Sequence, residues 1–210
     1  GSEMCIRDSI NIEKRVAITP DLIKKYKSLG FEIHLTKDYA SHIGILDEVY
    51  LSEGAKIFSN SKEVIDNSEV IIQMNILEDE NLNLLKENQF LIGVLNPFLN
   101  NKKLNNLNLK KVNCFSLELL PRITRAQSMD ILSSQANLAG YKAVIDSFAY
   151  FQKAIPMMMT AAGTISAAKV LVVGAGVAGL QAIATAKRMG AIVFATDVRM
   201  ASKEQVESLG

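Results

Sequence analysis

The sequence has few cysteines and no pattern that binds metal. Cys5 and Cys114 are the two cysteines among 210 residues, and they stand far apart with no CxxC or Cys/His spacing. We therefore expect no metal site and no disulfide framework, which is typical of a reducing compartment. An excess of one charge is also missing, because 23 basic and 22 acidic residues give a net charge of +1. This balance argues against nucleic acid as a partner.

Long apolar runs are absent too. No stretch reaches the roughly 18–20 residues that span a bilayer, and the opening GSEMCIRDSINIEKR has charges where a signal peptide needs an apolar centre. We expect a soluble chain without a direct membrane span, and we interpret residues 1–9 as a cloning or assembly remnant. Because the sequence stops one helix after Asp197, we also expect a fragment.

Apolar residues make up 49% of the chain, which is ample for a buried core, and they alternate between strand and helix patterns. A helix is expected from Pro20 to Leu29, and a second in GILDEVYLSEG; each ends at a glycine. Strands are expected at residues 31–35, 69–75, 90–96 and 112–120, with a helix in EDENLNLLKEN and a solvated helix with turns in the Asn-rich residues 96–111.

Strands that alternate with helices predict an α/β fold with mostly parallel sheets. Apolar residues recur at helical spacing from Leu138 to Phe151, which predicts one long helix. We expect two Rossmann-like domains with parallel sheets joined by this helix. The first covers residues 10–133, the linking helix residues 134–155, and a truncated second domain residues 156–210.

The segment VLVVGAGVAG has the form of a dinucleotide-binding turn. A wholly apolar strand, expected to be covered on both faces, leads into Gly174, Gly176 and Gly179 and then into a helix. The first glycine allows the tight turn, the second lets the backbone approach a pyrophosphate, and the third lets the helix pack on the strand. Val177 and Ala178, at the helix start, complete the expected phosphate site.

Asp197 ends the next strand, 23 residues after Gly174. A carboxylate there accepts hydrogen bonds from the adenosine ribose and repels a 2′-phosphate, which favours NAD over NADP. Val198 and Arg199 follow it and join the expected cofactor site. The positive charge of Arg199 would soften the exclusion of NADP, although a solvated surface arginine needs no role.

A second polar cluster follows the last strand of the first domain. The segment PRITRAQSMDILSS places Arg122, Gln127, Asp130 and Ser133 at the presumed cleft between the domains. Ser128 or Asp130 could instead cap the long helix, so spacing alone leaves a structural and a functional interpretation open.

The remaining candidates are interpreted as structural. His34 is placed at an outward-facing strand position and His42 in a turn, and neither has metal-ligand neighbours at a suitable spacing. Met157, Met158 and Met159 are expected to pack in the core or between domains. No arrangement of Ser, His, Asp or Cys indicates a covalent nucleophile.

Three segments, RAQSMDILSSQANLAGYKAVIDS, PMMMTAAGTISAAKVLVVGAGVAGLQAIATAKRMGA and ATDVR…KEQVESLG, carry a resemblance. They are similar to domain I of the alpha subunit of proton-translocating NAD(P) transhydrogenases, a family related to alanine dehydrogenase. The resemblance implies that NADH bound here gives hydride directly to NADP+ on a separate domain. It also implies that Arg122 and Asp130 orient the nicotinamide, that Gln127 lies between the two rings, and that Ser133 helps to hold the cofactor.

The resemblance further implies partners and a location. NADP(H) would sit on the NADP-binding domain of the beta subunit, and a membrane domain would couple hydride transfer to proton translocation. The chain is expected to form a homodimer and to be cytoplasmic, peripheral on the inner face of the bacterial plasma membrane through those partners. Hydride transfer between dinucleotides needs positioning rather than a nucleophile or metal, which agrees with the residues present.

Two alternatives remain. Alanine dehydrogenases use a lysine and a histidine to bind and protonate pyruvate, and the corresponding places here hold Asn75 and Asn96, although the substrate arginine is matched by Arg15. The other alternative is a non-catalytic NAD-binding module, against which the Arg122, Gln127 and Asp130 set argues.

Overall fold

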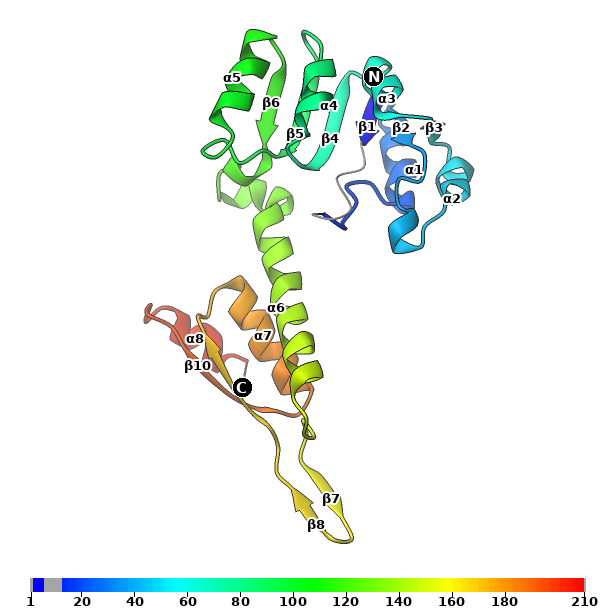
Figure 1. Cartoon of the computed structure of the whole chain (residues 1–210). Helices are drawn as coiled ribbons and strands as arrows, with labels where there is room; N and C mark the ends of the chain where they lie inside the picture. The colour runs from blue at the N-terminus through cyan, green and yellow to red at the C-terminus, as the bar shows by residue number, and fades with distance from the viewer. Residues whose placement is uncertain (1, 6–12, 210) are drawn as a thin grey trace. The chain divides into compact units, whose positions relative to one another are not determined.

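The computed structural model describes residues 2–5 and 13–209, which divide into two units after Met129. The first unit holds a six-stranded, wholly parallel sheet of order β3-β2-β1-β4-β5-β6 (Figure 1). Its strands are β1 (Ser2–Cys5), β2 (Glu32–Thr36), β3 (Lys56–Phe58), β4 (Val70–Asn75), β5 (Phe90–Val94) and β6 (Asn113–Ser116). The parallel α/β class expected from the alternating pattern is confirmed.

Strand β1 lies in the middle of this sheet, between β2 and β4. Residues 2–5, interpreted above as part of a cloning or assembly remnant, thus form a strand of the sheet, whereas their origin stays a prediction; residues 1 and 6–9 lie outside the described part. Because the strand order reverses between β1 and β4, their carboxyl ends flank a topological switch point, where open α/β sheets bind ligands.

Helices connect the parallel strands as the crossover rule requires. They are α1 (Pro20–Ser28), α2 (Asp47–Glu53), α3 (Ser61–Asp66), α4 (Asp79–Leu84) and α5 (Asn101–Leu109), with short 3-10 helices η1 (Ser41–Ile43), η2 (Leu117–Leu119) and η3 (Thr124–Met129). The Asn-rich segment forms α5 as expected. Sequence reasoning missed β3 and α3, which are short, and it extended the last strand four residues beyond β6, through η2 to Leu120.

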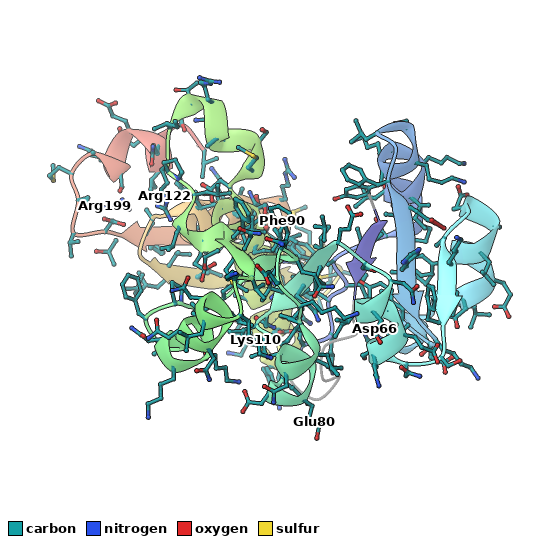
Figure 2. The ribbon with its side chains drawn as sticks, turned by 90° about the horizontal axis from the view of Figure 1, so that it is seen from above. Asp66, Glu80, Phe90, Lys110, Arg122 and Arg199 are labelled. Atoms are coloured by element: carbon teal, nitrogen blue, oxygen red, sulfur yellow. The ribbon has the colours of Figure 1, made fainter. Side chains whose placement is uncertain are left out.

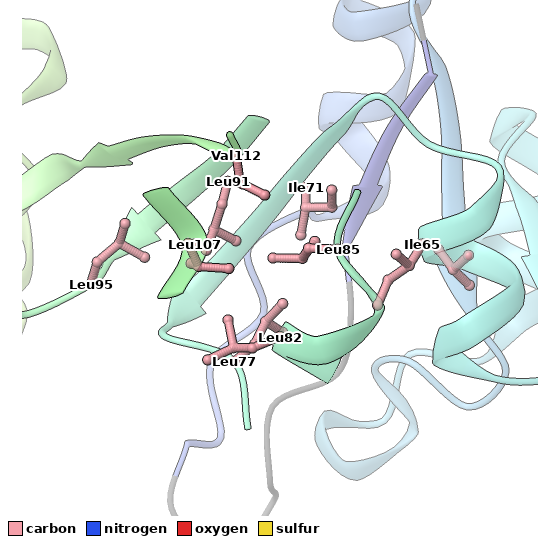
Figure 3. Close-up of a cluster of buried hydrophobic side chains, with 10 residues drawn as sticks. Ile65, Ile71, Leu77, Leu82, Leu85, Leu91, Leu95, Leu107 and Val112 are labelled. Carbon is pink, nitrogen blue, oxygen red and sulfur yellow. The ribbon is translucent and has the colours of Figure 1, made fainter. Parts of the chain in front are cut away.

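Apolar side chains from β4, β5 and the three helices α3 to α5 form the larger core of this unit (Figure 3). Ile71 and Leu91 come from neighbouring strands, and Leu82 and Leu107 come from α4 and α5. Lys110, directly after α5, reaches α4, where its Nζ donates to the carbonyl oxygen of Asn83 at 2.9 Å; Figure 2 labels it together with Glu80 of α4. A second core surrounds β2, α1 and α2 and contains the buried rings of Tyr39 and Tyr50.

His34 is buried, with 5% of its surface exposed, so its expected outward-facing position is wrong. Its Nδ1 lies 3.2 Å from the hydroxyl of Ser68, and its ring packs edge-on against Phe58 with centroids 5.0 Å apart. Strand β2 lies inside a parallel sheet that is covered on both faces, so its alternating pattern does not mark a solvent face. Burial lowers the pKa of His34.

Gln89 is a buried polar residue that ties α3 and the turn before β4 to the turn before β5. Its Nε2 donates to the carbonyl oxygens of Ile65 (2.9 Å) and Ser68 (2.8 Å), and its Oε1 accepts from the backbone N–H of Lys86 (2.7 Å). Without the amide, the Ser68 carbonyl oxygen and the Lys86 N–H lose this partner, and the Ile65 carbonyl oxygen keeps the backbone N–H of Ser68 at 3.4 Å.

Replacing Gln89 by leucine is therefore expected to lower the free energy of unfolding by about 2–4 kcal/mol, since each buried group left unsatisfied costs about 1–3 kcal/mol. Urea unfolding followed by circular dichroism measures this. Asn105→Leu serves as the control, because the Asn105 amide bonds to Asn101 on the exposed side of α5 and its loss costs little. Equal effects of the two substitutions would contradict the assigned role of Gln89.

The second unit contains one strand–helix–strand unit and a hairpin. Its elements are α6 (Ile131–Tyr150), β7 (Met158–Thr160), β8 (Gly163–Ile165), β9 (Lys169–Val173), α7 (Val177–Arg188), β10 (Ile192–Thr196) and α8 (Ser202–Glu207). Strands β9 and β10 pair in parallel, and β7 and β8 form an antiparallel hairpin that projects away from them (Figure 1). The long helix is confirmed as α6, whereas the domain boundaries at residues 133 and 155 stay predictions.

Two expectations about the second unit are wrong. Helices α6 and α7 pack on Val170, Val172 and Val193 from one side, so Leu171 and Val173 on the other face of β9 are exposed rather than covered. Core packing of Met157, Met158 and Met159 is the second wrong expectation, because they are exposed at the hairpin, whereas their packing between domains stays a prediction. Sequence reasoning missed this hairpin.

Candidate functional site

The turn between β9 and α7 has the geometry that its three glycines require. Gly174 has φ +95°, a left-handed conformation that favours glycine, and its N–H donates to Thr196 O at 2.7 Å. A Cβ on Gly179 would lie 1.8 Å from the carbonyl oxygen of Gly174, so the helix contacts the turn backbone directly. Gly176, the N-cap of α7, faces open space, and Val177 and Ala178 follow as the first helical residues.

The N-terminus of α7 presents unpaired backbone N–H groups and the positive end of the helix dipole to this open space. A helix start of this kind, with no side chain on Gly176, is suited to a phosphate group. The sequence-predicted residues Gly174 to Gly179 are therefore brought together as one turn. A cavity of about 340 Å³ adjoins it, lined by Ala175, by the end of β10 and by α8.

Asp197 closes the other side of this cavity, directly after β10. Its Oδ2 accepts from the backbone N–H of Ala175 at 2.6 Å, and its Oδ1 accepts from the backbone N–H of Arg199 at 2.8 Å. The guanidinium of Arg199 adds contacts of 3.1 Å from Nε and 3.2 Å from Nη2. Hydrogen bonding by the Arg199 side chain is the largest cause that holds the pKa of Asp197 well below its usual range.

Arg199 itself lies on the loop between β10 and α8, where Figure 2 labels it. Its side chain is 62% exposed, and Val198 beside it is fully exposed. The ion pair with Asp197 raises the pKa of Arg199. Sequence reasoning placed both charges at the site but missed their pairing, and an Asp-x-Arg spacing in a turn is the signal that could have indicated it.

Asp130 and Ser133 are joined at the start of α6. Asp130 is the N-cap of the helix, and its two carboxylate oxygens accept from the N–H (3.0 Å) and the hydroxyl (2.6 Å) of Ser133. The capping interpretation of Asp130 therefore describes what this structure shows. A role toward nicotinamide stays a proposal.

Arg122 and Gln127 lie in the preceding unit, Gln127 within η3 and Arg122 in the loop before it. Both side chains are exposed, and none of the hydrogen bonds or ion pairs among the described residues involves them.

Gly140 is a residue of this region that sequence reasoning missed. A Cβ on Gly140 would lie 2.1 Å from the carbonyl oxygen of Ala178, because α6 and α7 pack backbone to backbone there. Ala178 belongs to the first turn of α7, so α6 fixes the helix whose N-terminus faces the candidate phosphate site. A glycine within an apolar helix pattern was the available signal.

The carboxyl edge of the first sheet holds a separate polar cluster. Glu13 accepts from Arg15 Nη2 at 2.6 Å and Nε at 2.8 Å, and Asn75, at the end of β4, donates to Glu13 at 3.2 Å. Asn96 has φ +46°, and its N–H donates to a Glu118 carboxylate oxygen at 2.5 Å. Neither amide can serve as a titrating proton donor.

This cluster gives a pH prediction. Hydrogen bonding to Arg15 lowers the pKa of Glu13 to about 2, below the value near 4.3 of an unfolded chain. The stability from this group is therefore fully present above about pH 4.3 and is lost as pH falls toward 2. Between pH 5 and pH 3 we expect Glu13→Gln to remove about 1–2 kcal/mol of the pH dependence of the unfolding free energy.

Urea unfolding at the two pH values measures this difference. Arg15→Met is the matched variant, because removing the guanidinium should flatten the same slope while the carboxylate remains. A wild-type slope retained in both variants would contradict the assigned pair.

Within residues 2–5 and 13–209, no cluster of three His, Cys, Asp or Glu residues could hold a metal ion. In the same ranges no helix is both long enough and apolar enough to cross a membrane.

Comparison with known proteins places this geometry in a family. The family descriptions "Alanine dehydrogenase/PNT, N-terminal domain" and "Alanine dehydrogenase/PNT, C-terminal domain" match residues 5–139 and 143–210. An NAD(P) transhydrogenase alpha subunit of Rickettsia prowazekii is 46% identical over 211 residues, covering 99% of this chain and 55% of that protein. The protein of the same description from Rhodospirillum rubrum is 49% identical over 203 residues, covering 94% and 53%.

Among solved structures, a transhydrogenase from Sinorhizobium meliloti matches with a TM-score of 0.92 at 44% identity, covering 99% of this chain and 62% of that one. The chain thus spans about half the length of the curated relatives that it matches. These identities confirm the resemblance to transhydrogenase alpha subunits that the sequence motifs indicated. The chain belongs to the alanine dehydrogenase/PNT family.

Proposed function

We propose that this chain is the NAD(H)-binding part of a proton-translocating NAD(P) transhydrogenase. The observation that carries the proposal is its likeness, over 99% of its length, to a protein described as an NAD(P) transhydrogenase alpha subunit. The turn at Gly174 to Gly179, the N-terminus of α7 and the carboxylate of Asp197 support it, because they offer groups for a pyrophosphate and for a ribose. In this proposal Val198 and Arg199 border the adenosine.

The reaction is the transfer of a hydride, with its two electrons, from C4 of the NADH nicotinamide to C4 of NADP+, which leaves NAD+ and NADPH. No solvent proton enters this step. Arg122 and Asp130 orient the nicotinamide, Gln127 lies between the two rings, and Ser133 helps to hold the cofactor. These residues act by positioning and by excluding water.

The NADP(H) in this proposal is held by the beta subunit, and a membrane domain couples the reaction to proton translocation. The chain pairs with a second copy of itself. Its place is the cytoplasmic side of the bacterial plasma membrane, reached through its partners.

The family also contains alanine dehydrogenases, which form the alternative. That activity needs groups that bind and protonate a keto acid, and the chain has Asn75 and Asn96 where its alignment with alanine dehydrogenases calls for lysine and histidine. The Asn75 amide donates to Glu13, and Asn96 has a left-handed φ of +46°, a conformation that asparagine tolerates better than most residues, so both positions favour asparagine in this chain. A non-catalytic NAD-binding module is the remaining alternative.

Three assays separate these functions. The chain is mixed with NADH and an NADP+-loaded transhydrogenase domain, with alanine and NAD+, or with NADH alone. We expect NADPH in the first assay, no pyruvate in the second, and saturable NADH binding in the third. Pyruvate without NADPH would support the dehydrogenase, and binding without either product would support the module.

A further inference from the structure

Asp197 has no acceptor position left for a ligand. A carboxylate has about four lone-pair positions, and this one receives four donors: the N–H groups of Ala175 and Arg199, and Nε and Nη2 of the Arg199 side chain. Ribose hydroxyls that bind Asp197 must therefore displace a donor that is already there.

The Arg199 guanidinium is the donor that can leave. The two backbone donors are fixed by the turn before α7 and by the turn after β10, and their distances of 2.6 and 2.8 Å are the shortest. The guanidinium contacts are longer, at 3.1 and 3.2 Å, and the side chain is 62% exposed. The Asp197 side chain is 10% exposed, but the guanidinium is largely in solvent, so it can leave the carboxylate and be hydrated at little cost in free energy.

A new partner lies within reach of the guanidinium. Nη2 of Arg199 is 4.0 Å from the position of a Cβ on Gly176, at the N-cap of α7. This is the place where the proposed pyrophosphate meets the helix N-terminus. A guanidinium binds a phosphate through parallel hydrogen bonds as well as it binds a carboxylate.

We propose that Arg199 is a positioning residue that occupies Asp197 in the nucleotide-free chain and transfers to the pyrophosphate when the ribose takes its place. The inference rests on the proposed function, since it needs a dinucleotide in this cavity. Arg199 then opposes binding of the ribose alone and favours binding of ribose and phosphate together, so a bare nucleoside binds more weakly than it would without Arg199.

Adenosine and ADP, the probes for this exchange, share the ribose and differ in the phosphates. In Arg199→Met the competitor for Asp197 is gone, so adenosine is expected to bind about three- to fivefold more tightly. ADP loses its phosphate contact and is expected to bind about tenfold more weakly. Ligand-observed NMR titration of the whole chain measures both dissociation constants.

Lys203→Met is the matched control. It removes a positive charge from the wall of the same cavity, where Lys203 lies 3.7 Å from Glu207 and has no contact with Asp197. A general loss of positive potential weakens ADP and leaves adenosine unimproved, so only Arg199→Met should shift the two ligands in opposite directions.

Shifts in the same direction, or no shift, in Arg199→Met would overturn the exchange. If the wild-type chain bound neither NADH nor ADP, both the proposed function and the exchange would be contradicted. If it bound both but NADPH never formed in the transfer assay, the proposed function alone would fall, and opposite shifts in Arg199→Met would still establish the exchange.

Discussion

Gly179→Ala is expected to abolish NADH binding and to destabilise the second unit at the same time. The new methyl group would lie 1.8 Å from the carbonyl oxygen of Gly174 and 3.6 Å from the side chain of Val172. A change of side-chain rotamer cannot relieve this clash, because the clashing atom is the backbone carbonyl oxygen of Gly174. The start of α7 must move outward, and the N–H groups that face the phosphate move with it. We expect NADH affinity to fall at least about 100-fold.

Gly176→Ala provides the contrast to this variant. A Cβ there meets no atom nearer than Nη2 of Arg199 at 4.0 Å, so the fold accepts it, yet the methyl group points into the space proposed for the pyrophosphate. We expect nearly wild-type thermal stability with NADH binding lost. Because the chain contains no tryptophan, its own fluorescence interferes little with that of NADH, and NADH fluorescence can report binding. Unimpaired binding by Gly176→Ala would contradict the assignment of the phosphate site.

Gly140→Ala is expected to destabilise the second unit by about 1–3 kcal/mol or more, the cost of overpacking. In an isolated helix the same change stabilises by about 1 kcal/mol, because alanine has the higher helix propensity. Here the methyl group would lie 2.1 Å from the Ala178 carbonyl oxygen, and the contact between α6 and α7 must open. The sign of the change in unfolding free energy therefore tests whether α6 and α7 approach each other this closely.

Thermal unfolding and urea titration measure the stability of Gly140→Ala. Ala139→Gly, one residue earlier on the exposed side of α6, reports the propensity effect alone and should cost about 1 kcal/mol. A stabilised Gly140→Ala variant would contradict the close packing of α6 on α7. We also expect weaker NADH binding in Gly140→Ala, since α6 fixes the first turn of α7.

The turn around Gly174 could be predicted from sequence because its chemistry is local. Gly174 needs a left-handed φ, and Gly179 needs the absence of a side chain, so the residue types themselves record the geometry. Parallel sheets could be predicted because strand and helix patterns alternate at clear lengths. The close approach at Gly140 also follows from residue type, but only the structure names Ala178 as the neighbour.

Contacts between distant residues could not be predicted. His34 looked exposed because its strand alternates, and only the sheet order shows that β2 lies inside and is covered on both faces. The saturation of Asp197 depends on where the N–H of Ala175 points, 22 residues away. The exposure of one face of β9 and of the methionines at the hairpin depends on which surfaces of the second unit are covered by other elements. Residue patterns within one segment do not contain this information.

The transfer of deuterium from labelled NADH tests the central claim most directly. The chain is mixed with NADH that carries deuterium at both C4 positions and with an NADP+-loaded transhydrogenase domain in ordinary water, and the NADPH is analysed by mass spectrometry. Direct transfer predicts NADPH that carries the deuterium on its nicotinamide ring, with none lost to solvent. NADPH without the label, or no NADPH despite bound NADH, would contradict the account.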